Sequence, residues 1–82
     1  MYAAGIAPLL LHFKTHLAHS EKSPATIEKY LRDVGRFVRY AADGPFTKEL
    51  VLDYKTHLAD EYAVASANSM LASLNAFFRF AG

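Results

Sequence analysis

One pentapeptide, Lys-Thr-His-Leu-Ala, occurs twice in this chain of 82 residues, at positions 14–18 and 55–59. Each copy follows an aromatic residue, Phe13 in the first and Tyr54 in the second. The similarity continues downstream at nearly the same offset and divides the chain into two like units, each read as helix, connector, helix. The matching downstream positions are Leu31, Val34, Phe37, Arg39 and Ala41 in the first unit and Leu71, Leu74, Phe77, Arg79 and Ala81 in the second.

The first unit predicts two helices, because apolar residues recur at helical spacing over residues 7–19 and again over residues 24–41. Ser23 is a good N-cap for the second helix, and Pro24 suits its first turn. The segment Asp43-Gly44-Pro45 ends that helix, since Gly permits a left-handed cap and Pro cannot continue the hydrogen-bond ladder.

The second unit predicts two more helices. Thr47 can cap a third helix that ends near Tyr62, and a strongly apolar fourth helix begins at Ala65 or Ser66. No segment alternates with the period of two that is typical of a strand, so no sheet is expected. The aromatic run at residues 77–80 fits either a last helix docked on the core or a chain that continues beyond residue 82. The sequence therefore predicts an all-α protein.

Composition is typical of one globular domain over residues 1–82. Hydrophobic residues make up 52% and charged residues 21%, which is unlike a disordered chain. The absence of cysteine excludes disulfides and thiolate metal sites and permits an intracellular location. No apolar run approaches the length of a membrane span. We therefore expect a cytoplasmic protein without a membrane partner.

Charge is unevenly distributed along the chain, although the net charge is only +1. Residues 22–39 hold five cations and two anions, whereas residues 43–61 hold five anions and two cations. One face can therefore be basic while the molecule is almost neutral.

The basic residues of the second helix form the best candidate for a binding site. Lys29, Arg32, Arg36 and Arg39 follow i, i+3, i+7, i+10 spacing, which places four cations on one side. Lys22, Ser23 and Thr26 stand at the helix start, where free N–H groups favour phosphate. Such a helix fits the DNA major groove. The alternative is a solvated face with the ordinary i, i+4 pairs Glu28–Arg32 and Lys29–Asp33.

Other chemistry has little support in the sequence. His12, His16 and His19 share one side of the first helix, but no cysteine or carboxylate completes a zinc site at the usual spacing. No serine stands in a nucleophile motif, and the four glycines are isolated. We therefore expect no catalytic residue, metal or other cofactor in this chain.

Two segments of the chain resemble the core-binding domain of tyrosine recombinases, the family of phage integrases and Xer proteins. The resemblance covers residues from about Leu9 to Phe80. The first signature is Ser23-Pro24-Ala25-Thr26-Ile27-Glu28-Lys29-Tyr30 with Arg32, Asp33 and Phe37. The second is Asn68, Leu71, Leu74 and Phe77-Phe78-Arg79-Phe80.

The resemblance implies a compact four-helix orthogonal bundle built of two helical hairpins, with a SAM-like fold. Such domains clamp double-stranded DNA with their second and fourth helices during integration or recombination. A separate domain carries catalysis, so this chain is expected to be non-catalytic, with a catalytic domain downstream of residue 82. Neighbouring recombinase protomers, in a tetramer on paired DNA sites, are expected partners.

By position, the resemblance gives the DNA-contact role to residues of the second and fourth helices. The family commonly has basic residues where this chain has Ser69, Met70 and Asn75. Ser69 and Asn75 can still hydrogen-bond but add no charge, so affinity is expected mainly from the second helix. The full candidate set is Lys22, Ser23, Thr26, Lys29, Arg32, Arg36, Arg39, Ser66, Asn68, Ser69 and Asn75. The alternative function is a small helical protein–protein interaction module that uses the acidic third or aromatic fourth helix; an independent small enzyme ranks last.

Overall fold

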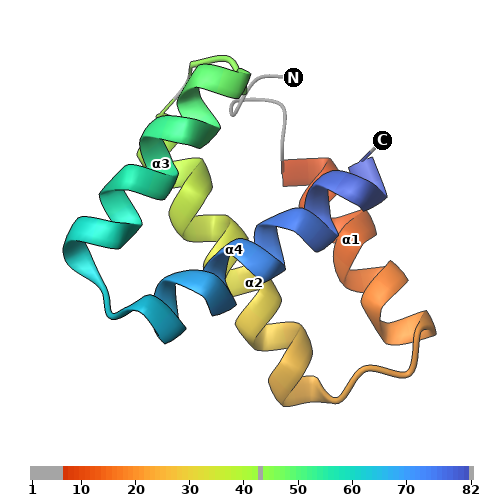
Figure 1. The fold of residues 1–82 in the computed structure, drawn as a ribbon. Helices are drawn as coiled ribbons and strands as arrows, with labels where there is room; N and C mark the ends of the chain where they lie inside the picture. Colours follow the sequence, from red (N-terminus) through yellow and green to blue (C-terminus); the bar gives the residue numbers. More distant parts are fainter. Residues whose placement is uncertain (1–6, 43, 82) are drawn as a thin grey trace.

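The structure, a computed structural model, describes residues 7–42 and 44–81, which form four helices (Figure 1). These are α1 (Ala7–His19), α2 (Pro24–Ala41), α3 (Lys48–Glu61) and α4 (Val64–Ala81). The predicted all-α class is confirmed, and the first three helices have the predicted bounds. No helix in the described part of the chain is long and apolar enough to cross a membrane.

Side-chain caps fix the starts of α2 and α3. The Oγ of Ser23 accepts a hydrogen bond from the Thr26 N–H at 3.2 Å, and the Oγ1 of Thr47 accepts one from the Leu50 N–H at 3.1 Å. Both capping residues have extended backbones, as an N-cap requires. The two connectors therefore end where the sequence predicted.

Two helix ends differ in detail from the prediction. The Ala67 N–H already donates to the Ala63 carbonyl at 2.9 Å, so α4 begins at Val64, slightly before the predicted start. At the end of α2, the positive φ of 52° belongs to Ala42 and not to Gly44. A Cβ on Gly44 would lie 3.3 Å from the Ala41 carbonyl oxygen, so Gly44 permits a close approach instead. Asp43 lies outside the described residues.

The centre of the molecule is the crossing of α2 and α4, with α1 and α3 on either side of it (Figure 1). The bundle is flattened, with extents of 33 × 29 × 18 Å. Each helix contributes at least two residues to one hydrophobic core. The buried apolar residues are Phe13 and Leu17 of α1, Val34 and Phe37 of α2, Tyr54 and Leu58 of α3, and Ala67, Met70, Leu74 and Phe77 of α4.

The two halves pack in the same way. The ring of Phe13 meets Phe77 of α4 edge-on at 5.2 Å, and its repeat counterpart Tyr54 meets Phe37 of α2 edge-on at 5.0 Å. The repeated leucine of each pentapeptide is buried. The sequence repeat is therefore an approximate two-fold relation between the two hairpins.

The histidines of the pentapeptide obey the same relation. His16 lies 4.9 Å from Phe80 with an interplanar angle of 33°, and His57 lies 5.0 Å from Tyr40 at 32°. Both histidines are exposed at the edge of the core. Their shared role is to pack against an aromatic ring of the helix opposite.

Candidate nucleic-acid interface

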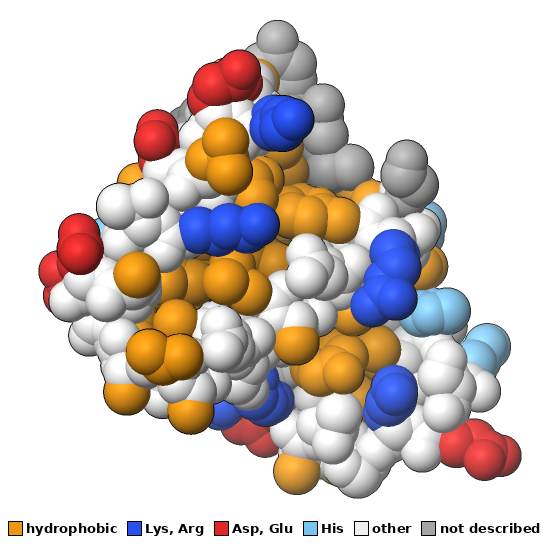
Figure 2. Space-filling model, in the orientation of Figure 1, with side chains coloured by type: hydrophobic (Ala, Val, Ile, Leu, Met, Phe, Trp, Pro, Cys, Tyr) orange, Lys and Arg blue, Asp and Glu red, His pale blue; other side chains and the backbone are white. Residues whose placement is uncertain are grey.

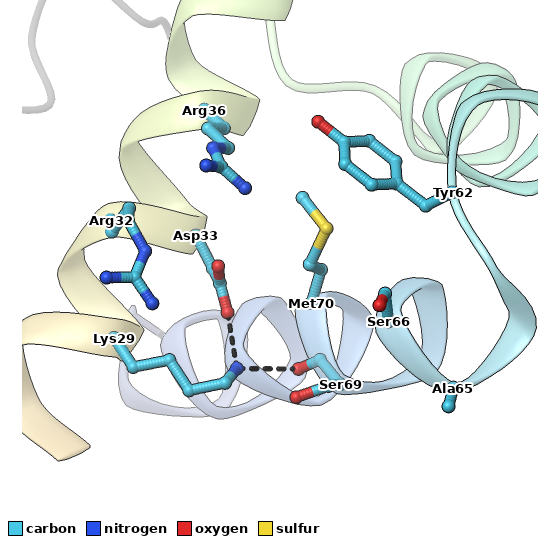
Figure 3. A pocket seen from close by; sticks show the side chains of 9 residues that line it. All are labelled: Lys29, Arg32, Asp33, Arg36, Tyr62, Ala65, Ser66, Ser69 and Met70. Carbon is cyan, nitrogen blue, oxygen red and sulfur yellow. Dashed lines mark hydrogen bonds and ion pairs between the residues drawn. The ribbon is translucent and has the colours of Figure 1, made fainter.

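An open groove of about 580 Å³ lies between α2 and the first turns of α4 (Figure 3). We call it the α2–α4 groove. It joins cations of α2 to hydroxyl groups of α4, which the sequence placed 30 or more positions apart. Its lining residues are Lys29, Arg32, Asp33, Arg36, Tyr62, Ala65, Ser66, Ser69 and Met70.

A buried polar cluster forms the floor of this groove. Asp33 is 3% exposed and Ser73 is fully buried, and the Ser73 hydroxyl donates to Oδ2 of Asp33 at 2.8 Å. The Lys29 ammonium donates to the same oxygen at 2.6 Å, which confirms the predicted Lys29–Asp33 pair. It also reaches the Ser69 carbonyl and the Ser73 hydroxyl, each at 3.3 Å. The ammonium of Lys29 thus has partners on both central helices.

Unlike Lys29, Arg32 and Arg36 form no ion pair with a carboxylate of the described chain. Lys29–Asp33 is the one ion pair within the described residues, 7–42 and 44–81. Neither arginine therefore has a carboxylate of the described chain within 4.0 Å. The Glu28–Arg32 pair allowed by the sequence is not formed. Arg32 is exposed and Arg36 is half-buried at the side of the groove. These two arginines can therefore offer forked N–H donors to an anion.

The structure brings together only part of the candidate set. Five members line the α2–α4 groove: Lys29, Arg32, Arg36, Ser66 and Ser69. The others lie elsewhere on the same two helices or in the connector before α2.

At the start of α2, Ser23 uses its hydroxyl internally. It caps the helix and donates to Oγ1 of Thr26 at 2.9 Å. Lys22 lines a separate hollow beside α1 and the end of α4. This end of α2 therefore stands apart from the α2–α4 groove.

The remaining candidates lie outside the groove. Asn68 and Asn75, seven residues apart on α4, are both exposed and do not line it. Their spacing places them on one face of the helix, whereas Ser66, Ser69 and Ser73 follow another. Arg39 lines a hollow on the far side of Arg36.

Tyr62 is the residue of the groove that the sequence reading missed. It caps the C-terminus of α3, where its N–H donates to the Leu58 carbonyl at 2.9 Å. Its side chain is 40% exposed, and Figure 3 shows its hydroxyl directed toward Arg36. The available signal was an aromatic residue in a short connector beside the fourth helix.

Lys and Arg side chains are spread over the face in view, whereas most of the acidic side chains on that face lie on α3 (Figure 2). Figure 2 shows acidic side chains gathered over α3 and histidines over α1. The acidic residues of α3 are all exposed, and they are Glu49, Asp53, Asp60 and Glu61. Within the described part of the chain, no three His, Asp or Glu side chains are grouped so as to hold a metal ion.

Comparison with known proteins gives one match. The chain matches the family described as phage integrase, N-terminal SAM-like domain, over residues 10–82. No curated protein and no solved structure matches it. The matched residues include all of both helical hairpins except the first three residues of α1, and they include the whole α2–α4 groove.

Proposed function

This chain belongs to the phage integrase N-terminal SAM-like domain family, and from that premise we propose that it binds double-stranded DNA as the non-catalytic domain of a site-specific tyrosine recombinase. The observation that carries the proposal is the α2–α4 groove. There, Arg32 and Arg36 stand without carboxylate partners in the described chain, beside the hydroxyl groups of Ser66 and Ser69. The proposal includes a cytoplasmic location.

Phosphate is the group that this groove suits best. A planar guanidinium offers paired N–H donors that match the geometry of phosphate oxygens, and its charge persists at every physiological pH. Serine hydroxyls add hydrogen bonds that position the backbone without reading sequence. A helix such as α2 also has the width to enter the major groove, where arginine can reach guanine edges.

In the full recombinase, this domain would clamp one side of the recombination-site duplex during integration or another exchange reaction. A catalytic domain would follow residue 82, and protomers would meet as a tetramer on paired sites. Lys22, Asn68 and Asn75 would contribute further contacts only if the duplex extends beyond the α2–α4 groove.

The test is the salt dependence of binding to a labelled mixed-sequence duplex of about 30 base pairs. If three to five phosphates are contacted, the log–log slope of the association constant against salt should be about −3 to −4. Replacing both Arg32 and Arg36 by Ala should weaken binding at least tenfold and make the slope shallower by about two. Helicity by circular dichroism should be unchanged, because neither side chain is part of the core.

The matched control replaces Lys14 and Lys55, the exposed lysines of the two pentapeptides, by Ala. This variant loses the same charge at sites outside the groove and should retain the slope of the parent. Binding that ignores salt, or equal losses in the two double variants, would contradict the α2–α4 groove as the DNA site.

The second candidate function is a protein-interaction module. It is favoured by the exposed acidic residues of α3, which give one side of the molecule a negative surface (Figure 2). A complete lack of duplex binding at low salt, together with capture of a basic protein partner that is lost on neutralising Asp53 and Asp60, would support this function over DNA binding.

A further inference from the structure

A second hollow, of about 340 Å³, lies between α2 and α3. We call it the α2–α3 hollow. Arg36 and Tyr62 line both this hollow and the α2–α4 groove, so the two depressions meet at these residues. The lining residues are Arg36, Arg39, Tyr40, Tyr54, His57, Leu58 and Tyr62.

The hollow has a fixed apolar floor and a polar rim. Tyr54 and Leu58 are buried beneath it, and Tyr40 is packed at 4.9 Å from Tyr54 and 5.0 Å from His57. Tyr40 and Tyr62 are each 40% exposed. Because contacts with Tyr54 and His57 hold the Tyr40 ring in place, binding a ligand here does not have to order that ring.

The Arg39 side chain lies back along α2. Its Nη1 lies 3.8 Å from the place that a Cβ of Gly35 would occupy, so the guanidinium lies back along α2 by about one turn. Arg36 and Arg39 are also close enough to Tyr54 to oppose the rise in its pKa that burial causes. Two guanidinium groups therefore surround the same small hollow.

Comparing the α2–α3 hollow with its counterpart in the other hairpin shows which of its residues belong to the common scaffold and which are specific to it. An equivalent hollow between α1 and α4 contains Phe13, His16, Phe80 and Arg79, the counterparts of Tyr54, His57, Tyr40 and Arg39. The aromatic–histidine packing is common to both and is structural. At the place of Arg36 the other hollow has Ala76, and its cations are Lys22 and Arg79. A pair of guanidinium groups on one helix therefore distinguishes the α2–α3 hollow.

We propose that the α2–α3 hollow is a second phosphate subsite on the DNA strand that occupies the α2–α4 groove, with the Arg39 guanidinium and the Tyr62 hydroxyl as donors. This inference rests on the proposed function. Arg32 and Arg39 are separated by about 10 Å along α2, at 1.5 Å per residue. Because the two depressions meet at Arg36 and Tyr62, a strand lying along α2 can place one phosphate in the α2–α4 groove and a neighbouring phosphate in the α2–α3 hollow.

Single substitutions at the subsite test this inference on the same duplex. Arg39→Gln should weaken binding about fivefold and make the salt slope shallower by about one. Tyr62→Phe removes one uncharged donor and should weaken binding about threefold with the slope unchanged. Lys14→Gln removes one exposed charge outside both depressions. It should change the affinity by less than twofold and leave the salt slope unchanged.

The outcomes separate the subsite from the proposed function. If Arg39→Gln behaves like Lys14→Gln and Tyr62→Phe like the parent, while replacement of Arg32 and Arg36 by Ala still weakens binding at least tenfold, the subsite is wrong and the function stands. If the parent chain binds no duplex at low salt, the function fails and the subsite with it. Equal slope changes for Arg39→Gln and Lys14→Gln would show a net-charge effect and also overturn the subsite.

Discussion

Lys29 shows why a basic residue on a basic helix is not automatically a phosphate contact. Its ammonium lies 2.6 Å from a carboxylate that is almost fully buried, and it reaches the Ser69 carbonyl of α4 at 3.3 Å. Breaking these contacts to bind DNA would leave Asp33 as a buried charge with only the Ser73 hydroxyl beside it. Lys29 is therefore placed to hold α2 against α4, whereas Arg32 and Arg36 line the α2–α4 groove without a carboxylate of the described chain within 4.0 Å.

Lys29→Met should accordingly act on stability. We expect the free energy of unfolding to fall by about 1–2 kcal/mol, at the low end for loss of a buried pair because the Lys29 side chain is 36% exposed. Urea denaturation followed by circular dichroism measures this.

Arg32→Met serves as the matched control for that experiment, because it removes one exposed cation from the same helix. Its free energy of unfolding should stay within about 0.5 kcal/mol of the parent. Equal effects of the two variants would show that Lys29 is an ordinary surface charge.

At this scale the sequence predicted only the local half of the cluster. The i, i+4 spacing of Lys29 and Asp33 is visible in the sequence, and the pair is confirmed. The burial of Ser73 could not be predicted, because its partner Asp33 is 40 positions away and only the helix crossing brings them together. Tyr62 was missed for a different reason, because a residue outside a helix gives no periodic signal.

At the scale of helices, local capping chemistry explains both the success and the limits of prediction. Ser23 and Thr47 are strong capping residues, so the starts of α2 and α3 followed directly from them. Ala63 and Val64 are not capping residues, so the sequence predicted a start of α4 at Ala65 or Ser66 instead of Val64. The end of α2 depends on Ala42 adopting a positive φ, which alanine rarely does and which no sequence rule would assign to it.

Removing either cap should weaken the fold measurably. We expect Ser23→Ala and Thr47→Ala each to lower the free energy of unfolding by about 1 kcal/mol, because each leaves an N–H of the first turn without its side-chain acceptor. Thermal or urea denaturation measures the change.

Thr15→Ala is the matched control for the caps. The Thr15 hydroxyl bonds the Leu11 carbonyl inside α1, where that carbonyl already belongs to the helix ladder. This variant should be neutral or more stable by a few tenths of a kcal/mol, since Ala favours helix. A loss for Thr15→Ala as large as that for Ser23→Ala would contradict the capping account.

For the whole molecule, the repeat predicted two similar hairpins, and their matched aromatic contacts confirm it. The repeat did not predict which helices would cross at the centre. In the structure that crossing is held by the edge-on contact of Phe37 and Phe78 at 5.7 Å and by the Ser73–Asp33 hydrogen bond. The shared scaffold lies in α1 and α3. The two halves differ most on α2. When the repeat is aligned, Arg32 and Arg36 of α2 correspond to Ala72 and Ala76 of α4.

The global stability of the bundle should respond to alkaline pH through Tyr54. Burial is the main cause that raises the pKa of its phenol above the ordinary value near 10, and Tyr62 adds to the rise. The unfolded chain then loses this proton at lower pH than the folded protein, so the contribution of Tyr54 to stability is complete below pH 10 and is lost as pH rises through the folded pKa.

Tyr54→Phe should remove the part of the alkaline loss of stability that Tyr54 causes. Its counterpart in the other half is already a phenylalanine, Phe13, in an equivalent edge-on contact, so the variant should fold. The measurement is the urea midpoint of parent and variant between pH 8 and about pH 11.5. We expect the difference between the two curves to change in favour of the variant above pH 10, and parallel curves would show that Tyr54 ionises equally readily in the folded and unfolded chains.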